Sequence, residues 1–201
     1  TVLGKPISEL TTALENGLSD MSGSNAVILG AILGLMMAFD MGGPLNKVAY
    51  SFAAAGVGSA ATLAGDAPEL KIMAAVMLAG MVPPLALALA TVVRPGLFDP
   101  AERENGKAAW LLGASFISEG AIPFAAADPL RVIPGIMLGS AVTGGLSMAM
   151  EVSVRAPHGG IFVLFAVENV LGYLIALAGR VVREWPWPGA SMHQTSAPRP
   201  A

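Results

Sequence analysis

Glu119 is a carboxylate inside a long apolar stretch, in the sequence Ser-Glu-Gly-Ala-Ile-Pro at Ser118–Pro123. The apolar segments Trp110–Ile117 and Phe124–Ala127 lie on either side of it. A charged group at membrane depth is costly unless it faces a cavity, a partner or a ligand. Gly120 follows it and opposes a regular helix. Transporters build substrate sites from charged groups on broken backbone at this depth, so Glu119 is the leading functional candidate.

Two roles are open to this carboxylate. As a functional group it can handle a proton, or it can bind a sugar, because it accepts hydrogen bonds from two hydroxyls at once and such charge-assisted bonds are strong. As a structural group it can cap the helix that begins after it through backbone N–H groups. The cost of an idle carboxylate in lipid favours the functional interpretation.

A second polar group surrounds Gly42-Gly43-Pro44, with Asp40 before it and Asn46-Lys47 after it. The glycines and the proline prevent a continuous helix, so this segment is expected to be irregular backbone between two apolar segments. It is either a plain interhelical loop in which Asp40 pairs with Lys47, or a second half of the site that contains Glu119.

His158 lies in the sequence Pro157-His158-Gly159-Gly160. It is either an ordinary loop residue or a group that exchanges a proton with a substrate hydroxyl near neutral pH. Gly159 and Gly160 could expose backbone N–H groups to an anion such as a sugar phosphate. The other histidine, His193, lies in the C-terminal segment, and the chain has no cysteine, so no metal site is expected.

Other polar and small residues are expected to be structural. Asp128 and Arg131 are three positions apart and should pair at a turn or helix end. Glu168-Asn169, inside an apolar segment, should make interhelical hydrogen bonds, and the spacings Gly30–Gly34 and Gly135–Gly139 fit the close packing of membrane helices.

The composition predicts an integral membrane protein. The chain has 201 residues, of which 54% are hydrophobic and 12% charged, and its mean hydropathy is +0.66. A soluble domain has roughly 25% charged residues. The net charge of −3 and the lack of a Lys/Arg cluster make nucleic acid an unexpected partner.

Six apolar segments alternate with polar connections. Pro83-Pro84 should kink or break the third of them, Arg94–Lys107 is the clearest loop, and Thr1–Gly23 is either an amphipathic surface helix or a connecting helix. The fold class expected is all-α, a polytopic membrane helix bundle with re-entrant hairpins and broken helices. The six segments are Ala26–Phe39, Val48–Gly65, Ile72–Val93, Ala108–Ala127, Val132–Met150 and Ile161–Gly179.

Loop charges suggest an orientation. The positive-inside rule places Arg94–Lys107 in the cytoplasm. If Ala108–Ala127 dips into the membrane and returns on the same side, Arg131, Arg180 and Arg183 also lie inside, whereas a full span would place the last two outside. The charges therefore favour a re-entrant hairpin. Residues 1–184 are expected to form the membrane domain and residues 185–201 a disordered cytoplasmic tail.

Four stretches together resemble the fructose-family membrane component, enzyme IIC, of the bacterial phosphoenolpyruvate-dependent sugar phosphotransferase system. They are spread over most of residues 1–180. The motif Phe116-Ile117-Ser118-Glu119 is similar to the Gly-Ile-Thr-Glu-type motif of that family, with Phe116 and Ser118 in place of its glycine and threonine. The four stretches are Gly30–Tyr50, Gly80–Leu85, Phe116–Pro134 and Ala156–Phe162.

The resemblance implies uptake of a sugar, most simply fructose, across the bacterial inner membrane by a multi-pass protein. It implies phosphorylation of that sugar from a phosphocysteine of enzyme IIB, which is supplied by enzyme IIA, with no other cofactor. It also implies a homodimer, and the chain looks like the C-terminal part of such a domain. Glu119 would be the catalytic and sugar-binding residue. The other substrate-binding candidates are Ser118, Gly120, His158, Gly159, Asp40 and Asn46.

The resemblance further implies that rocking or elevator-like motion exposes the sugar to the cytoplasmic face. Mannitol or a related compound remains a possible substrate. Two other classes compete with this interpretation, namely an ion- or proton-coupled secondary transporter with Glu119 as its proton site, and an inactive membrane fragment.

Overall fold

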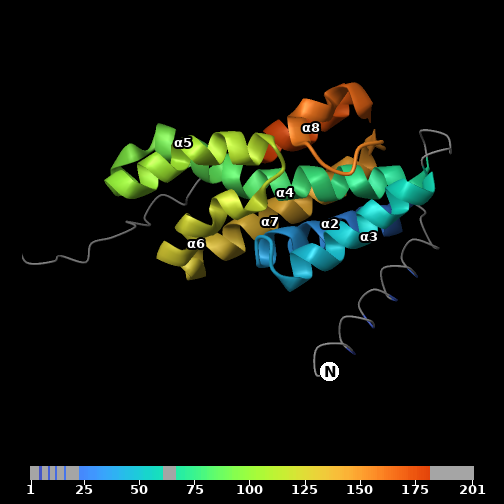
Figure 1. Ribbon diagram of the computed structural model, residues 1–201, viewed down its shortest axis with the longest axis horizontal. Coiled ribbons are helices and arrows are strands. Elements are labelled where there is room, and N and C mark those ends of the chain that lie inside the picture. Colours follow the sequence, from blue (N-terminus) through green and yellow to red (C-terminus); the bar gives the residue numbers. More distant parts are fainter. Residues whose placement is uncertain are drawn as a thin grey trace, which may run out of the picture.

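The computed structural model describes residues 23–60 and 67–181, together with the isolated positions Lys5, Glu9, Thr12 and Asn16. Its described part is an elongated bundle of helices (Figure 1). The expectations for most of residues 1–22, for the side chains of Arg180 and Arg183, and for the tail at 185–201 fall outside it. The elements are α2 (Gly23–Phe39), α3 (Pro44–Ala60), α4 (Pro68–Val93), η1 (Pro95–Leu97), α5 (Pro100–Ala114), η2 (Ser118–Ala121), α6 (Ile122–Ala127), α7 (Pro129–Ala149), β1 (Ser153–Val154), η3 (Gly160–Ala166), β2 (Val167–Glu168) and α8 (Val170–Val181).

Helix α4 is the centre of the bundle. It is apolar on all sides, as expected of a helix without a solvent-facing surface, and α2, α3, α5, α7 and α8 all pack against it. The helix continues through Pro83-Pro84 as one element, so the break that these prolines allowed does not occur. The all-α expectation is confirmed for the architecture, although the described chain also contains the short antiparallel pair β1–β2.

Two described helices are long and apolar enough to cross a membrane, judged by length and composition. They are α4, with a mean hydropathy of 2.2, and α7, with 1.5. Helix α2 is apolar but shorter. The apolar segments predicted at Ala26–Phe39, Ile72–Val93 and Val132–Met150 thus correspond to helices. Within the described ranges 23–60 and 67–181, only α4 and α7 reach the length of a span.

Small residues bring α2 and α7 together. A Cβ on Gly34 would collide with the backbone of Ser140, and one on Gly30 would collide with Gly144. The predicted packing role of Gly30–Gly34 is confirmed. The matching surface of α7 is formed by Ser140 and Gly144, because a Cβ on Gly135 would meet no atom within 4 Å.

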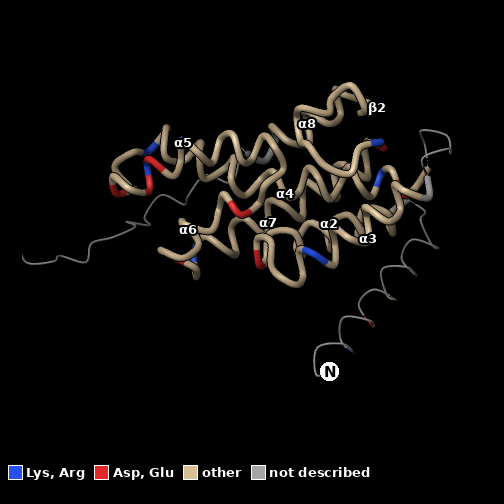
Figure 2. The backbone as a smooth tube through the Cα atoms, viewed as in Figure 1, with Lys and Arg blue, Asp and Glu red and all other residues tan. Residues whose placement is uncertain are grey.

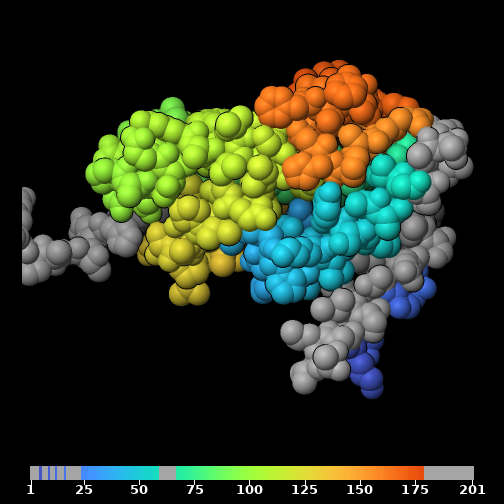
Figure 3. Space-filling model, in the orientation of Figure 1, coloured from blue at the N-terminus to red at the C-terminus, as the bar shows by residue number. Residues whose placement is uncertain are grey.

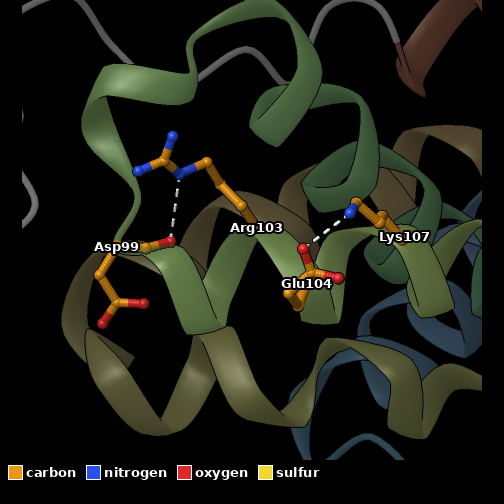
Figure 4. A network of polar contacts seen from close by, with 4 residues as sticks. All are labelled: Asp99, Arg103, Glu104 and Lys107. Carbon is orange, nitrogen blue, oxygen red and sulfur yellow. Dashed lines mark hydrogen bonds and ion pairs between the residues drawn. The ribbon is translucent and has the colours of Figure 1, made fainter.

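The segment Arg94–Lys107 is largely helical, which corrects its prediction as a loop. Asp99 caps α5, because its Oδ1 accepts a hydrogen bond of 2.8 Å from Glu102 N while Glu102 Oε2 accepts one of 2.8 Å from Asp99 N. This capping box starts the helix despite its charge. The charged residues of the chain are sparse, and one group gathers where α5 begins (Figure 2). Figure 4 shows Lys107 Nζ paired with Glu104 Oε1 at 2.7 Å.

The predicted span Ile161–Gly179 is also wrong. It divides into η3, β2 and α8, and Asn169, with a positive φ of 61°, separates β2 from α8. Asn169 Nδ2 donates a hydrogen bond of 2.8 Å to Met150 O and so links the ends of α7 and α8, as an interhelical role required. Glu168 instead pairs with Arg155 at 3.3 Å, beside the β1–β2 pair.

The connection from α5 to α6 is a hairpin. Helix α5 runs to Ala114, η2 packs against both α4 and α5, and α6 then turns back toward α7 (Figure 1). Helices α2 and α3 form a second hairpin, joined by the turn at residues 40–43. The predicted pair of Asp128 and Arg131, at the start of α7, is confirmed at 3.0 Å.

Candidate functional site

Glu119 lies in η2, at the turn of the α5–α6 hairpin, and its residue is exposed. Its side chain makes no hydrogen bond or ion pair within the described residues, and neither η2 nor α6 has a side-chain cap. The structural alternative, in which Glu119 caps the following helix, is therefore wrong. Both carboxylate oxygens are available to accept hydrogen bonds from a ligand.

The turn between α2 and α3 reaches this carboxylate. Gly42 has a φ of +101°, and a Cβ built there would overlap Glu119 Oε1 and lie 2.8 Å from Glu119 Cδ. The close approach thus depends on the absence of a side chain at Gly42. The facing turn is also left-handed, because Phe116 has a φ of 66°. Residues in this region are costly and cluster at functional sites.

Asn46 ties the two hairpins together. It is 6% exposed, and its Nδ2 donates hydrogen bonds to Met37 O at 2.7 Å and to Ser118 Oγ at 3.2 Å. Both amide protons are thereby used inside the protein. Ser118 is also buried, so this pair holds the residue next to Glu119 in place.

Asp40 caps α3. Its Oδ2 accepts a hydrogen bond of 2.7 Å from Leu45 N, and its Oδ1 accepts one of 2.9 Å from Asn46 N. These are two of the otherwise unpaired donors of the first helical turn. The ion pairs of the described residues do not include the expected one between Asp40 and Lys47. Asp40 therefore orients the helix that carries Asn46.

His158 reaches the same region from a third segment. Its ring centroid lies 5.1 Å from that of Phe116 and 6.3 Å from that of Tyr50. Gly160 allows this approach, because a Cβ there would overlap Ala114 O and lie 2.9 Å from Phe116 N. The residue His158 is exposed, and its imidazole makes no hydrogen bond within the described part of the chain.

The predicted candidates therefore converge. Asn46 bonds Ser118, the neighbour of Glu119, and the ring of His158 contacts Phe116 in the same turn. The yellow-green, cyan and orange parts of the chain to which these residues belong border one another in Figure 3. Gly120 has a packing role, because a Cβ there would lie 3.0 Å from Leu112 Cβ and 3.1 Å from Pro84 Cβ. Gly159, at φ +124°, shapes the loop that carries His158.

Sequence reasoning missed two aromatic residues of the site, Tyr50 and Phe116. Their ring centroids lie 6.0 Å apart, and both contact the ring of His158. One signal was available for Tyr50, which follows Asn46 by four positions and so shares its face of α3. The site combines a free carboxylate, an imidazole and a phenol beside buried apolar rings, which suits a neutral ligand with several hydroxyl groups.

The chain is similar to fructose-specific proteins of the phosphotransferase system (PTS). It is 53% identical over 185 residues to the PTS system fructose-specific EIIB'BC component of Escherichia coli K12, with 90% of this chain and 31% of that protein covered. It is 54% identical over 164 residues to the PTS system fructose-specific EIIC component of Haloferax volcanii, with 81% and 42% covered.

A third relative is the fructose permease IIC component of Bacillus amyloliquefaciens, 46% identical over 176 residues, with 88% of this chain and 55% of that protein covered. The chain thus spans only part of the length of these relatives, about a third in the first case. No protein-family model matches the chain, and no solved structure matches it significantly. Over most of its length the chain is homologous to one part of longer proteins named as fructose-specific components of the phosphotransferase system.

Proposed function

We propose that this chain binds fructose and carries it across the bacterial inner membrane, coupled to phosphorylation of the sugar by enzyme IIB. The observation that carries the proposal is the free carboxylate of Glu119, held where three segments meet, in a chain about half identical to fructose-specific components. A carboxylate without an internal partner, beside aromatic rings and an imidazole, suits a polyhydroxylated ligand.

In this proposal Glu119 accepts hydrogen bonds from two sugar hydroxyls, and His158 contacts a third. Asn46, Ser118 and Gly120 hold Glu119 in position, because their polar or packing contacts lie inside the protein. Asp40 contributes indirectly, because it caps the start of α3 and so orients Asn46. Gly42 leaves the space that the carboxylate occupies.

We propose that the phosphoryl group passes directly from enzyme IIB to the sugar. The sugar hydroxyl attacks the phosphorus of the enzyme IIB phosphocysteine in line, an O–P bond forms, and the S–P bond breaks to release the cysteine thiolate. Glu119 orients the attacking hydroxyl and accepts its proton. The chain contains no cysteine, so the phosphocysteine belongs to another domain or chain.

The hairpin formed by α5, η2 and α6 is proposed to be re-entrant and to open toward the cytoplasm, where enzyme IIB works. The charged start of α5 would then lie at the cytoplasmic surface, as the positive-inside rule requires. Relatives named EIIB'BC and EIIABC support fused or separate IIB and IIA partners. We further propose that the protein is a homodimer in the lipid bilayer. A rocking or elevator-like motion would expose the sugar to the cytoplasmic face.

The test is fructose uptake and phosphorylation in a bacterial host that lacks its own fructose components, with enzyme IIB supplied. The proposal expects both to depend on phosphoenolpyruvate and to persist when an uncoupler removes the proton gradient. Uptake of free fructose that needs the gradient but no phosphoenolpyruvate would establish a proton-coupled transporter instead. A panel that includes mannitol and other hexoses and hexitols identifies the sugar.

A further inference from the structure

We propose that Tyr50 is a sugar-contacting residue that determines specificity, with its ring against a C–H face of the sugar and its hydroxyl bonded to a sugar hydroxyl. The inference rests on the proposed function and gives a role to a residue that was not among the substrate-binding candidates predicted from the sequence. It starts from a difference between the two tyrosines of the chain, Tyr50 and Tyr173.

Tyr173 has the environment of a structural tyrosine. It is completely buried in α8, and its hydroxyl donates a hydrogen bond of 3.2 Å to Met81 Sδ. Tyr50 is only partly buried, and its hydroxyl makes no hydrogen bond within the described residues. Tyr173 thus has the internal partner that a buried tyrosine hydroxyl usually has, whereas the Tyr50 hydroxyl has none and is available to a ligand.

The position of Tyr50 places it beside the predicted sugar ligands. It lies one helical turn after Asn46, which bonds Ser118, the neighbour of Glu119. Its ring contacts the ring of His158 edge-on, at 6.3 Å and 78°. Tyr50 therefore lies on the side of α3 that faces both η2 and the loop carrying His158.

Phe116 supports the ring of Tyr50 from behind. It is 5% exposed and lies 6.0 Å from Tyr50 and 5.1 Å from His158, between centroids. Tyr50 and His158 are thus two partly exposed rings on one buried ring. Together they offer apolar faces and two free polar groups, a combination that matches the C–H faces and hydroxyls of a sugar.

The test measures fructose affinity of the purified 201-residue chain in lipid nanodiscs. Tyr50→Phe removes only the hydroxyl and should weaken binding about fivefold, the value of one ordinary hydrogen bond. Tyr50→Leu removes the ring as well and should weaken binding more than Tyr50→Phe. Phe165→Leu is the control, because Phe165 is 89% exposed and makes no ring contact with the site.

Two further readouts separate ligand contact from packing. Among the monodeoxy fructoses, one should bind equally well to the wild type and to Tyr50→Phe, because it lacks the hydroxyl that Tyr50 contacts. Nitration of tyrosine should modify Tyr50 and spare the buried Tyr173, and fructose should protect Tyr50.

The outcomes distinguish this inference from the function on which it rests. Wild-type affinity in Tyr50→Phe and Tyr50→Leu, while Glu119→Gln abolishes binding, would overturn the role of Tyr50 and leave the proposed function intact. A uniform loss in Tyr50→Phe for every deoxy sugar, without protection from nitration, would also overturn it. A wild-type chain that binds no fructose would overturn both.

Discussion

Asn46 and Ser118 are 72 positions apart in the chain, and a buried hydrogen bond of 3.2 Å from Asn46 Nδ2 to Ser118 Oγ joins the turns of two helical hairpins. One hairpin is formed by α2 and α3, and the other by α5 and α6. Glu119 follows Ser118 directly, so the same bond fixes the position of the proposed sugar ligand. This link suggests how a carboxylate on a short, irregular segment can have a defined geometry.

Replacing Ser118 with alanine should break this link. Asn46 Nδ2 would keep its bond to Met37 O and lose the one to Ser118, at a cost of about 1 kcal/mol in the free energy of unfolding. Fructose affinity should fall severalfold because Glu119 is held less firmly. Thermal unfolding and fructose titration measure the two effects, and Ser118→Thr, which keeps the hydroxyl, should restore both. Wild-type affinity in Ser118→Ala would show that the link is irrelevant to binding.

Replacing Gly42 with alanine should displace the Glu119 carboxylate. The new Cβ would overlap Glu119 Oε1, and a φ of +101° costs a residue with a side chain about 1–3 kcal/mol. We expect fructose binding to be lost in a variant that still contains normal helix by circular dichroism. Gly135→Ala is the matched control, because a Cβ at Gly135 meets nothing within 4 Å. Equal fructose affinities in the two variants would show that Gly42 is not needed for sugar binding.

Asp40 should prove to be a helix cap. Asp40→Ala leaves Leu45 N and Asn46 N without their acceptor and should lower the free energy of unfolding by about 1 kcal/mol. Asp40→Asn keeps one of the two acceptor oxygens and loses the charge, so it should destabilise the protein less than Asp40→Ala and bind fructose within about threefold of the wild type. A stable Asp40→Asn variant that binds no fructose would mean that the carboxylate itself contacts the sugar.

His158 contributes either its ring or its nitrogens, and one substitution separates them. His158→Phe keeps an aromatic ring against Phe116 and Tyr50 but removes both hydrogen-bonding atoms. We expect His158→Phe to have unchanged thermal stability and about fivefold weaker fructose affinity, which corresponds to the loss of one hydrogen bond. Isothermal titration measures that affinity. Full binding by His158→Phe would reduce His158 to a packing residue of the loop.

Hydrophobicity alone predicted the core of this fold. The runs at Ala26–Phe39, Ile72–Val93 and Val132–Met150 became α2, α4 and α7, because long apolar runs must be buried in protein or lipid. The same criterion failed for Ile161–Gly179, which is equally apolar. There the left-handed backbone of Asn169 separates β2 from α8, and hydropathy does not report backbone angles.

The prediction that the start of α5 is a loop was wrong because it relied on charge. The segment after Arg94 looked like a loop because it is polar, yet Asp99 and Glu102 form a reciprocal cap and the helix begins at Pro100. Asp99, Pro100 and Glu102 have the spacing typical of a helix start. The high proportion of charged residues in this segment led to its prediction as a loop instead.

The sequence identifies site residues where a charged side chain lies inside an apolar segment, because such a residue is costly in a membrane. Glu119 could be singled out from its cost in an apolar segment. Its neighbours in space could not, since the approach of Gly42 and the ring contact between Tyr50 and Phe116 depend on how the α2–α3 hairpin lies against the turn at residues 115–119. Such contacts between distant segments are properties of the folded chain.

The central claim is that the Glu119 carboxylate binds the sugar and serves its phosphorylation, and Glu119→Gln tests it most directly. This change keeps the side-chain volume and removes only the charge and the proton-accepting ability. The matched control is Glu151→Gln, which removes the charge of a glutamate that pairs with Lys71 at 3.5 Å and is 75% exposed. The measurement is phosphorylation of fructose with enzyme IIB and its phosphoryl donors supplied. The account predicts that Glu119→Gln folds normally and forms no fructose phosphate, whereas Glu151→Gln matches the wild type. Normal phosphorylation of fructose by Glu119→Gln would contradict it.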